Sequence, residues 1–229
     1  VPLLEEALAA MNITTISKED YEADDILATL SLQGAEQGYR VLVVSGDRDT
    51  IQLVDENVKL LYPNARGVSE LKTYDTDAVI ERYGIRPEQY PEIAALVGET
   101  SDNLPGVDKV GEKTAVKWIQ QFGSLDELLA RADEIKGVAG NNLREQMDRV
   151  VRNRKLNRLL RDVELPVGPA DLERRPIDAS AVRAVFDRLQ FRTLLDRVLK
   201  IEGAAADAGI VEAEIAAEAA ETPVVRTMV

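Results

Sequence analysis

Hydrophobic and polar positions in the first part of the chain follow the periods of strands and helices. Residues 39–44 are apolar apart from Arg40 and end at a glycine and two aspartates, which is typical of a strand buried on both faces in a parallel sheet. Residues 21–32 carry apolar side chains at positions 23, 26, 27 and 30, the spacing of a helix with one buried face. Further strands are predicted at 13–16 and 58–62, and further helices at 1–10, 75–83 and 87–97.

The pattern changes after Gly98, where most segments are helical and are separated by glycine-containing turns. The next predicted strand is only at 163–166. The predicted helices lie at 113–122, 124–131, 143–160 and 179–199. We therefore expect three parts: an α/β core over 1–97, a helical domain over 98–201, and an acidic, alanine-rich linker or disordered tail over 202–229.

The 229-residue chain contains neither cysteine nor histidine. Without cysteine there is no disulfide, thiolate nucleophile or cysteine zinc site, which fits a reducing cytoplasm. Without histidine no Ser-His or Cys-His dyad can form. Any hydrolytic chemistry must therefore come from carboxylates, lysine, tyrosine or a bound metal. The sequence also has no run of about 18 apolar residues, so no membrane-spanning helix is expected.

The net charge of −13 argues at first against a nucleic-acid partner, but the charges are unevenly distributed. Residues 106–161 hold 12 Lys/Arg against 8 Asp/Glu, and residues 149–161 hold six basic residues and no acid. This basic strip includes Arg152 and Lys155. It is either an ordinary solvated helix face or a contact for phosphates.

Three clusters of acidic residues are the candidates for a catalytic or metal-binding site. Each could be no more than a helix cap or a turn, and Arg48 could pair locally with a neighbouring carboxylate. Together, at helix starts and strand ends, they predict an oxygen-only site for Mg²⁺ or Mn²⁺. Two such ions about 3.5 to 4 Å apart stabilise the attacking and leaving oxygens of a phosphodiester displacement. The residues are Glu22, Asp24 and Asp25, then Asp47 and Asp49, then Glu99 and Asp102.

The glycine-rich stretch 106–114 is similar to a phosphate-binding P-loop, but Glu112 comes before Lys113 and no buried strand precedes it. We therefore favour a hairpin between two helices, whose free amides at the following helix start would contact phosphate without reading sequence. A tight helix-helix turn with surface lysines is the plainer alternative. A third alternative is that the chain is a nucleotide-binding protein that uses this loop.

Four motifs resemble, in order and spacing, the 5′ nuclease domain of bacterial DNA polymerase I, a member of the flap endonuclease superfamily. The motifs are YEADD at 21–25, SGDRD at 45–49, GETSDNLPG at 98–106 and VGEKTA at 110–115. The resemblance implies a PIN-like α/β nuclease core followed by a helix-three-turn-helix DNA-binding region. It also implies metal-dependent 5′ to 3′ exonuclease and flap endonuclease activity on 5′-flap, nicked or gapped DNA, including RNA-primed duplex, during replication and repair.

The resemblance also implies roles for particular residues. Glu22 and Asp24 would contribute to a first Mg²⁺ or Mn²⁺ ion, and Asp47, Asp49 and Asp102 to a second. Asp25 and Glu99 would act nearby, and K⁺ could help the hairpin hold a phosphate. The candidate DNA-binding residues are Ser101, Gly106, Val110, Gly111, Lys113, Thr114, Arg152 and Lys155.

The family's first strand, with its metal-binding aspartate, and its basic helical arch have no counterpart in this sequence. We therefore expect a truncated nuclease core, monomeric and joined to a polymerase domain. A catalytically incomplete DNA-binding module is the alternative.

Overall fold

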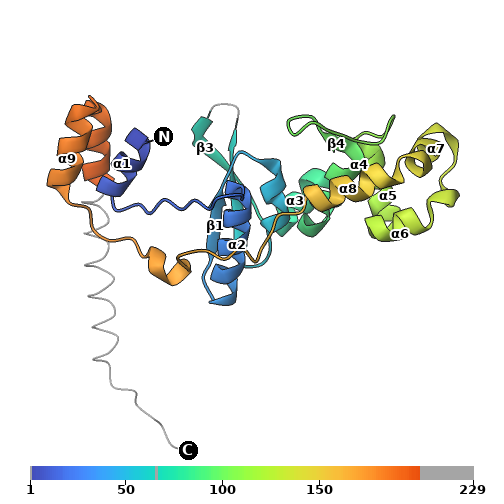
Figure 1. Ribbon diagram of the computed structural model, residues 1–229, viewed down its shortest axis with the longest axis horizontal. Helices are drawn as coiled ribbons and strands as arrows, with labels where there is room; N and C mark the ends of the chain where they lie inside the picture. The colour runs from blue at the N-terminus through green and yellow to red at the C-terminus, as the bar shows by residue number, and fades with distance from the viewer. Residues whose placement is uncertain (1, 65–66, 202–229) are drawn as a thin grey trace, which may run out of the picture. The chain divides into compact units, whose positions relative to one another are not determined.

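The computed structural model describes residues 2–64 and 67–201, which belong to two compact units (Figure 1). The larger unit spans Ser17–Asp171. The smaller unit joins the described residues up to Ile16 to those from Leu172 onward. The predicted acidic tail at 202–229 lies outside the described residues. Within the described ranges, no helix is both long enough and apolar enough to cross a membrane.

The smaller unit is a helical cluster in which α1 (Pro2–Ala10) packs against α9 (Ala179–Arg188). Its core contains Val182 and Phe186, and the Phe186 ring meets the Phe191 ring edge-on at a centroid distance of 5.8 Å. The single helix predicted at 179–199 is wrong, because Gln190 takes a left-handed conformation with φ 59° and a second helical segment follows at 192–201. Residues 13–16, predicted as a strand, form no ladder in the structure.

The larger unit contains a small mixed sheet in the order β1-β2-β3. Strand β1 (Val41–Val44) runs parallel to β2 (Val58–Asn64), which pairs antiparallel with β3 (Gly67–Tyr74). Strand β2 continues through Pro63, where the sequence predicted its end, and the register shifts between Pro63 and Asn64. Strand β3 was not predicted, because every residue before Tyr74 is exposed and the strand lacks apolar alternation.

Strand β1 is covered on one face only, so the prediction of a strand buried on both faces is wrong. Helix α2 (Ala23–Glu36) packs against it, and a Cβ on Gly34 would lie 3.0 Å from the Val41 Cγ2 atom. Val43 is buried on that face, whereas Leu42 and Val44 on the other are 61% and 55% exposed. Side chains alternate between the two faces of a strand, so the exposure of Leu42 and Val44 shows that no described element covers the second face.

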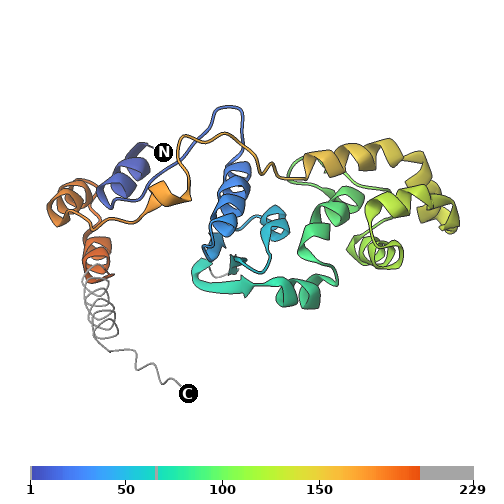
Figure 2. The same cartoon turned by 90° about the horizontal axis from the view of Figure 1, so that it is seen from below.

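The helices of the larger unit share one hydrophobic core with the sheet, which runs from Ala28 to Leu159 in sequence. Helix α4 (Tyr90–Val97) packs against α5 (Glu112–Phe122) and α8 (Met147–Leu156) (Figures 1 and 2). The remaining elements are η1 (Arg48–Leu53), α3 (Thr76–Tyr83), η2 (Pro87–Gln89), β4 (Gly98–Glu99), β5 (Leu104–Pro105), α6 (Leu125–Ala130), η3 (Ala132–Glu134), α7 (Gly137–Glu145) and η4 (Pro169–Leu172).

Most predicted helices are confirmed, including those at 75–83, 113–122 and 124–131, but the end of the larger unit differs from the prediction. The single helix predicted at 143–160 is wrong, because this range holds the end of α7 and the whole of α8, which are separated at Gln146, and α8 ends at Leu156. The strand predicted at 163–166 is irregular, and the Val163 amide donates to the Thr29 hydroxyl at 3.2 Å instead of to a neighbouring strand. The short pair β4 and β5 was not predicted.

Candidate active site

Asp47 and Asp49 lie where β1 ends and η1 begins, as the sequence predicted. The Asp47 Oδ1 atom accepts a hydrogen bond from the Asp49 amide at 2.9 Å, and the Thr50 hydroxyl donates to the Asp47 carbonyl at 2.6 Å. These contacts hold Asp49 half-buried. Its Oδ1 atom is shielded from solvent and has no hydrogen-bond partner among the described residues. A buried carboxylate oxygen without a partner is costly unless a cation or a proton satisfies it.

Asp102 reaches the same region on a hairpin that two glycines hold together. Gly98 has φ +84°, and a Cβ added there would be 2.2 Å from the Gly106 nitrogen. A Cβ on Gly106 would in turn be 2.1 Å from the Val97 carbonyl carbon. Because neither position can carry a side chain without displacing backbone, the motif at 98–106 fixes the β4-β5 hairpin. Its turn, residues 100–103, presents Ser101 and Asp102 on the surface.

The pKa shifts indicate that carboxylates from three segments lie close enough to raise one another's pKa. Burial, followed by the charges of Glu99, Asp47, Asp102 and Asp24, raises the pKa of Asp49 to about 7. Burial and then Asp102 and Asp47 raise the pKa of Glu99. The pKa of Asp24 is raised by burial and then by Asp47. These residues repel one another when all are ionised.

The other two acids of the first cluster lie differently. Glu22 is the exposed N-cap residue of α2, and its charge contributes to the raised pKa of Asp24. Asp25 uses its Oδ1 atom to accept a hydrogen bond from the Leu160 amide at 2.8 Å. Asp25 therefore ties α2 to the segment after α8.

Hard divalent cations match this donor set, which is made of carboxylate oxygens only. The partnerless Asp49 oxygen and the crowded charges around it fit such an ion. In residues 2–64 and 67–201, however, no three acidic side chains are arranged so that they could hold one metal ion together. The acids thus lie near enough to interact electrostatically, but in the described residues they do not form a complete set of ligands for one metal ion.

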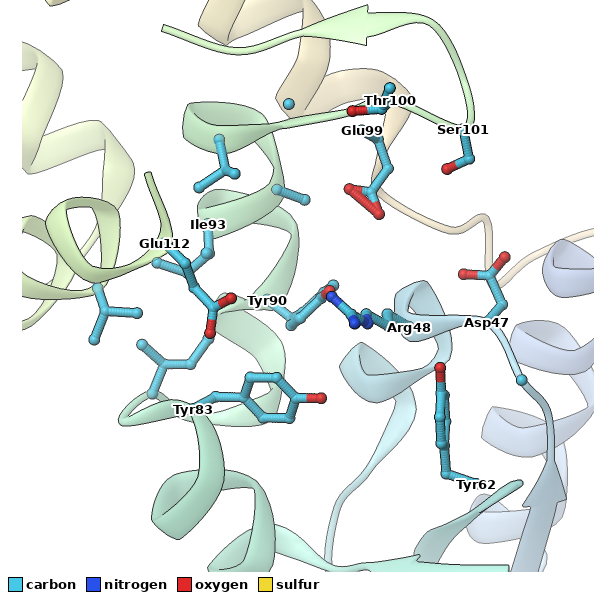
Figure 3. A pocket seen from close by; sticks show the side chains of 16 residues that line it. Asp47, Arg48, Tyr62, Tyr83, Tyr90, Ile93, Glu99, Thr100, Ser101 and Glu112 are labelled. Atoms are coloured by element: carbon cyan, nitrogen blue, oxygen red, sulfur yellow. The ribbon is translucent and has the colours of Figure 1, made fainter. Parts of the chain in front are cut away.

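A cavity of about 430 Å³ adjoins this acidic cluster (Figure 3). Asp47 and Glu99 belong to both the cluster and the cavity wall, and Arg48 lies inside the cavity. Three tyrosines complete one side, namely Tyr62, Tyr83 and Tyr90. The sequence analysis missed this constellation. Arg48 and the three tyrosines come from four separate elements, and only the SGDRD motif pointed to Arg48.

The predicted DNA-binding residues of the glycine-rich stretch 106–114 lie around the start of α5. Gly111 is the N-cap residue, and a Cβ there would meet no described atom within 4 Å. Lys113 is exposed and Thr114 is half-buried. Val110 differs from the rest, because its side chain is 7% exposed and packs in the core. It can therefore offer only its backbone to a phosphate.

The basic strip at 149–161 has two functions in the structure. Arg152 and Lys155 are exposed on α8, as a phosphate contact would require. Three other members hold the fold together. Arg149 donates to the Gly106 carbonyl at 3.0 Å, Arg154 pairs with Glu92 at 3.5 Å, and Arg161 donates to the Gln52 carbonyl at 2.7 Å.

A small mixed sheet with carboxylates at its carboxyl end, followed by a glycine-clamped hairpin and a helical layer, defines a 5′-nuclease type of architecture. Residues 1–84 match the family described as 5′-3′ exonuclease, N-terminal resolvase-like domain. Residues 85–180 match the family described as 5′-3′ exonuclease, C-terminal SAM fold. The chain belongs to the 5′-3′ exonuclease family.

Curated relatives and solved structures agree with this assignment. The chain is 48% identical over 205 residues to DNA polymerase I of Mycobacterium bovis, which covers 90% of this chain and 23% of that protein. It is 38% identical over 198 residues to DNA polymerase I of Bacillus caldotenax, covering 86% and 22%. The chain therefore spans less than a quarter of the length of these relatives.

The fold is similar to that of the flap endonuclease of bacteriophage T5, solved in a complex with DNA and metal ions. The TM-score is 0.54 at 20% identity, covering 80% of this chain and 60% of that one. At this identity the likeness establishes the shared α/β core and helical part.

Proposed function

We propose that the chain is the 5′ to 3′ exonuclease and flap endonuclease module of a DNA polymerase I, acting on DNA in replication and repair. The observation that carries the proposal is that acids from three segments lie close enough to Asp49 to raise its pKa to about 7, while the Asp49 Oδ1 atom has no partner among the described residues. Residues 1–97 would supply the nuclease core, residues 98–201 the DNA-binding part, and residues 202–229 the link to a polymerase. The module would act as a monomer.

The acidic cluster would hold two Mg²⁺ or Mn²⁺ ions, with Glu22 and Asp24 on one side and Asp47, Asp49 and Asp102 on the other. Because no three acids of the described residues are arranged to hold one ion together, binding would have to draw these carboxylates closer. Bound ions of this kind lower the pKa of water and neutralise charge that develops on a phosphodiester. Glu99 is close enough to the other acids to affect their charge, and we assign it to the outer part of the site. Asp25 would position α2 through its bond to the Leu160 amide.

Duplex DNA would lie against the start of α5 and the exposed side of α8. Amides at a helix start and lysine ammonium groups attract phosphates without reading base sequence. Gly111, Lys113 and Thr114 are the first contact, to which K⁺ could contribute, and Ser101 and Gly106 lie on the adjoining hairpin. Arg152 and Lys155 are the second contact. The substrates would be 5′-flap, nicked or gapped duplexes, including those that carry an RNA primer.

Cleavage of a 5′-labelled flap duplex in Mg²⁺ tests this proposal. Asp47→Asn should abolish cleavage, because it removes a carboxylate from the centre of the cluster. Asp77→Asn is the matched control, since Asp77 is an exposed acid in the first turn of α3. Where the wild-type chain cleaves, equal turnover by both variants would refute the assigned site. If the wild-type chain binds the duplex with steep salt dependence but does not cut it, the catalytically incomplete DNA-binding module is the correct alternative.

A further inference from the structure

The cavity beside the acidic cluster has one strongly organised wall, made by tyrosines packed on one another. The ring centroids of Tyr62 and Tyr74 are 6.2 Å apart, those of Tyr74 and Tyr83 6.1 Å, and those of Tyr83 and Tyr90 5.9 Å. The first and last of these pairs meet edge-on. Such packing fixes ring orientation. Figure 3 shows the hydroxyl groups of Tyr62, Tyr83 and Tyr90 directed toward the space around Arg48.

Arg48 is held by this wall. Its guanidinium lies beside Tyr62 and Tyr90 in the cavity (Figure 3), and its interaction with the Tyr62 side chain raises the pKa of Arg48. A guanidinium held in this way offers a flat face for stacking and a fork of donors for paired acceptors.

The remaining walls combine apolar and acidic groups. Ile93 and Val97 of α4 and Val116 of α5 give an apolar side, and Glu99 and Glu112 direct carboxylates toward the centre (Figure 3). With Asp47, the lining carries three carboxylates against the single guanidinium of Arg48. This excess of negative charge would repel a phosphate inside the cavity. A neutral flat ring that carries hydrogen-bond donors and acceptors would not be repelled in this way.

We propose that this cavity is a binding site for a nucleobase. Its volume of about 430 Å³ lies in the range of small-ligand pockets. Arg48 would pair with a ring nitrogen and a carbonyl oxygen of the base or stack on it, and Glu99 or Glu112 would accept from an exocyclic amino group. The site rests on the proposed function in one respect, because Asp47 and Glu99 belong to both the acidic cluster and the cavity wall. A DNA strand whose phosphate contacts the acidic cluster would therefore have a base next to the cavity.

Free nucleosides test the site without phosphate, metal or cleavage. The full chain is titrated with deoxyguanosine, and methyl signals are followed by NMR in EDTA. We expect the largest shifts at Ile93, Val97 and Val116, and affinity about tenfold weaker or more in Arg48→Ala. Val116→Phe, which fills the cavity, should remove binding, and Val138→Phe on an exposed position of α7 is its control. No saturable shifts at these methyls, or equal affinity in Val116→Phe and Val138→Phe, would overturn the proposal.

A second arm distinguishes a base within a strand from a free one. Flap duplexes with a normal or an abasic nucleotide beside the cleavage position are bound in Ca²⁺. If the strand is the source, Arg48→Ala weakens only the normal duplex, by about tenfold. If both duplexes bind the variant as they bind the wild type while deoxyguanosine still saturates, the site takes the free nucleoside. Equal weakening of both duplexes would mean that Arg48 serves phosphate and would overturn the proposal. Failure of the Asp47→Asn test would leave the nucleoside titration unaffected, so the two proposals are separable.

Discussion

The Asp47 carboxylate accepts a hydrogen bond from the Asp49 amide at 2.9 Å, so the first acid of the SGDRD motif fixes the position of the second. The same contact makes Asp47 the N-cap of η1. Asp47 thus has a structural role that can be separated from its proposed role at the metal. The separation is possible because the amide side chain of asparagine also caps a helix but lacks the negative charge.

Substitutions of Asp47 should separate these roles. Asp47→Ala is expected to lower the free energy of unfolding by about 1 kcal/mol, because the Asp49 amide loses its acceptor. Asp47→Asn should lower it by only a few tenths of that amount, since an acceptor remains. Both variants should lose flap cleavage. Urea unfolding and single-turnover cleavage measure the two effects. Equal stability of Asp47→Ala and Asp47→Asn would show that the cap contributes nothing.

The pKa of Asp49 predicts how stability depends on pH without metal. Because the folded-state pKa is raised to about 7, above the ordinary aspartate value, the folded protein binds more protons than the unfolded chain between these values. The free energy of unfolding should therefore fall as pH rises from about 4 to about 7 and then level off. In Asp49→Asn this contribution should be absent.

Thermal unfolding in EDTA at several pH values checks this prediction. At pH 8, Asp49→Asn should be more stable than wild type by on the order of 2 kcal/mol, a figure reduced to allow for the solvent that still reaches the group. Mg²⁺ should then raise the wild-type melting temperature more than that of the variant. A melting temperature for Asp49→Asn at or below that of wild type at pH 8 would contradict the raised pKa.

The parts that the sequence predicted are those encoded locally. An apolar run that ends in SGDRD places two acids at a strand end, and Gly98 and Gly106 bracket the turn that carries Asp102. The tyrosine wall could not be predicted, because Tyr62, Tyr83 and Tyr90 belong to elements whose contacts form only in the folded chain. The pattern of charges along the sequence also does not predict which arginines are buried by contacts that form only on folding.

A basic strip without acids does not reveal which of its arginines turn inward. Arg154 does so because its partner, Glu92, lies on α4 and is far from it in sequence. Burial likewise cannot be inferred from composition alone. Strand β1 has the apolar sequence of a doubly covered strand, yet Leu42 and Val44 are exposed within the described structure.

The backbone contact between Gly98 and Gly106 predicts that the hairpin tolerates no side chain at either position. Gly98→Ala should lower the free energy of unfolding by at least about 2 kcal/mol, because it combines a positive φ with overlap on Gly106. Cleavage should also fall, since the turn that carries Asp102 must move. The control is Gly111→Ala, where a Cβ would meet no described atom within 4 Å. Similar unfolding midpoints for the two variants in urea would refute the clamp.

The helical part offers a comparison between an exposed and an internal cation. Lys113→Ala should weaken duplex binding and reduce the slope of log K against log[salt] by about one, because one phosphate contact is lost. Its unfolding free energy should change little, since Lys113 is exposed. Arg154→Ala should do the reverse. Burial raises the pKa of Glu92, and the paired Arg154 acts to lower it.

Removing Arg154 leaves the buried Glu92 carboxylate without its cation, which should cost about 3 kcal/mol of unfolding free energy. The double variant Arg154→Ala/Glu92→Gln should recover part of this loss, because the Glu92 carboxylate also accepts from the Leu125 amide at 3.2 Å and glutamine keeps an acceptor. Fluorescence anisotropy at several salt concentrations and urea unfolding provide the two readouts. A salt slope that falls in Arg154→Ala as much as in Lys113→Ala would place Arg154 on the DNA and contradict its internal role.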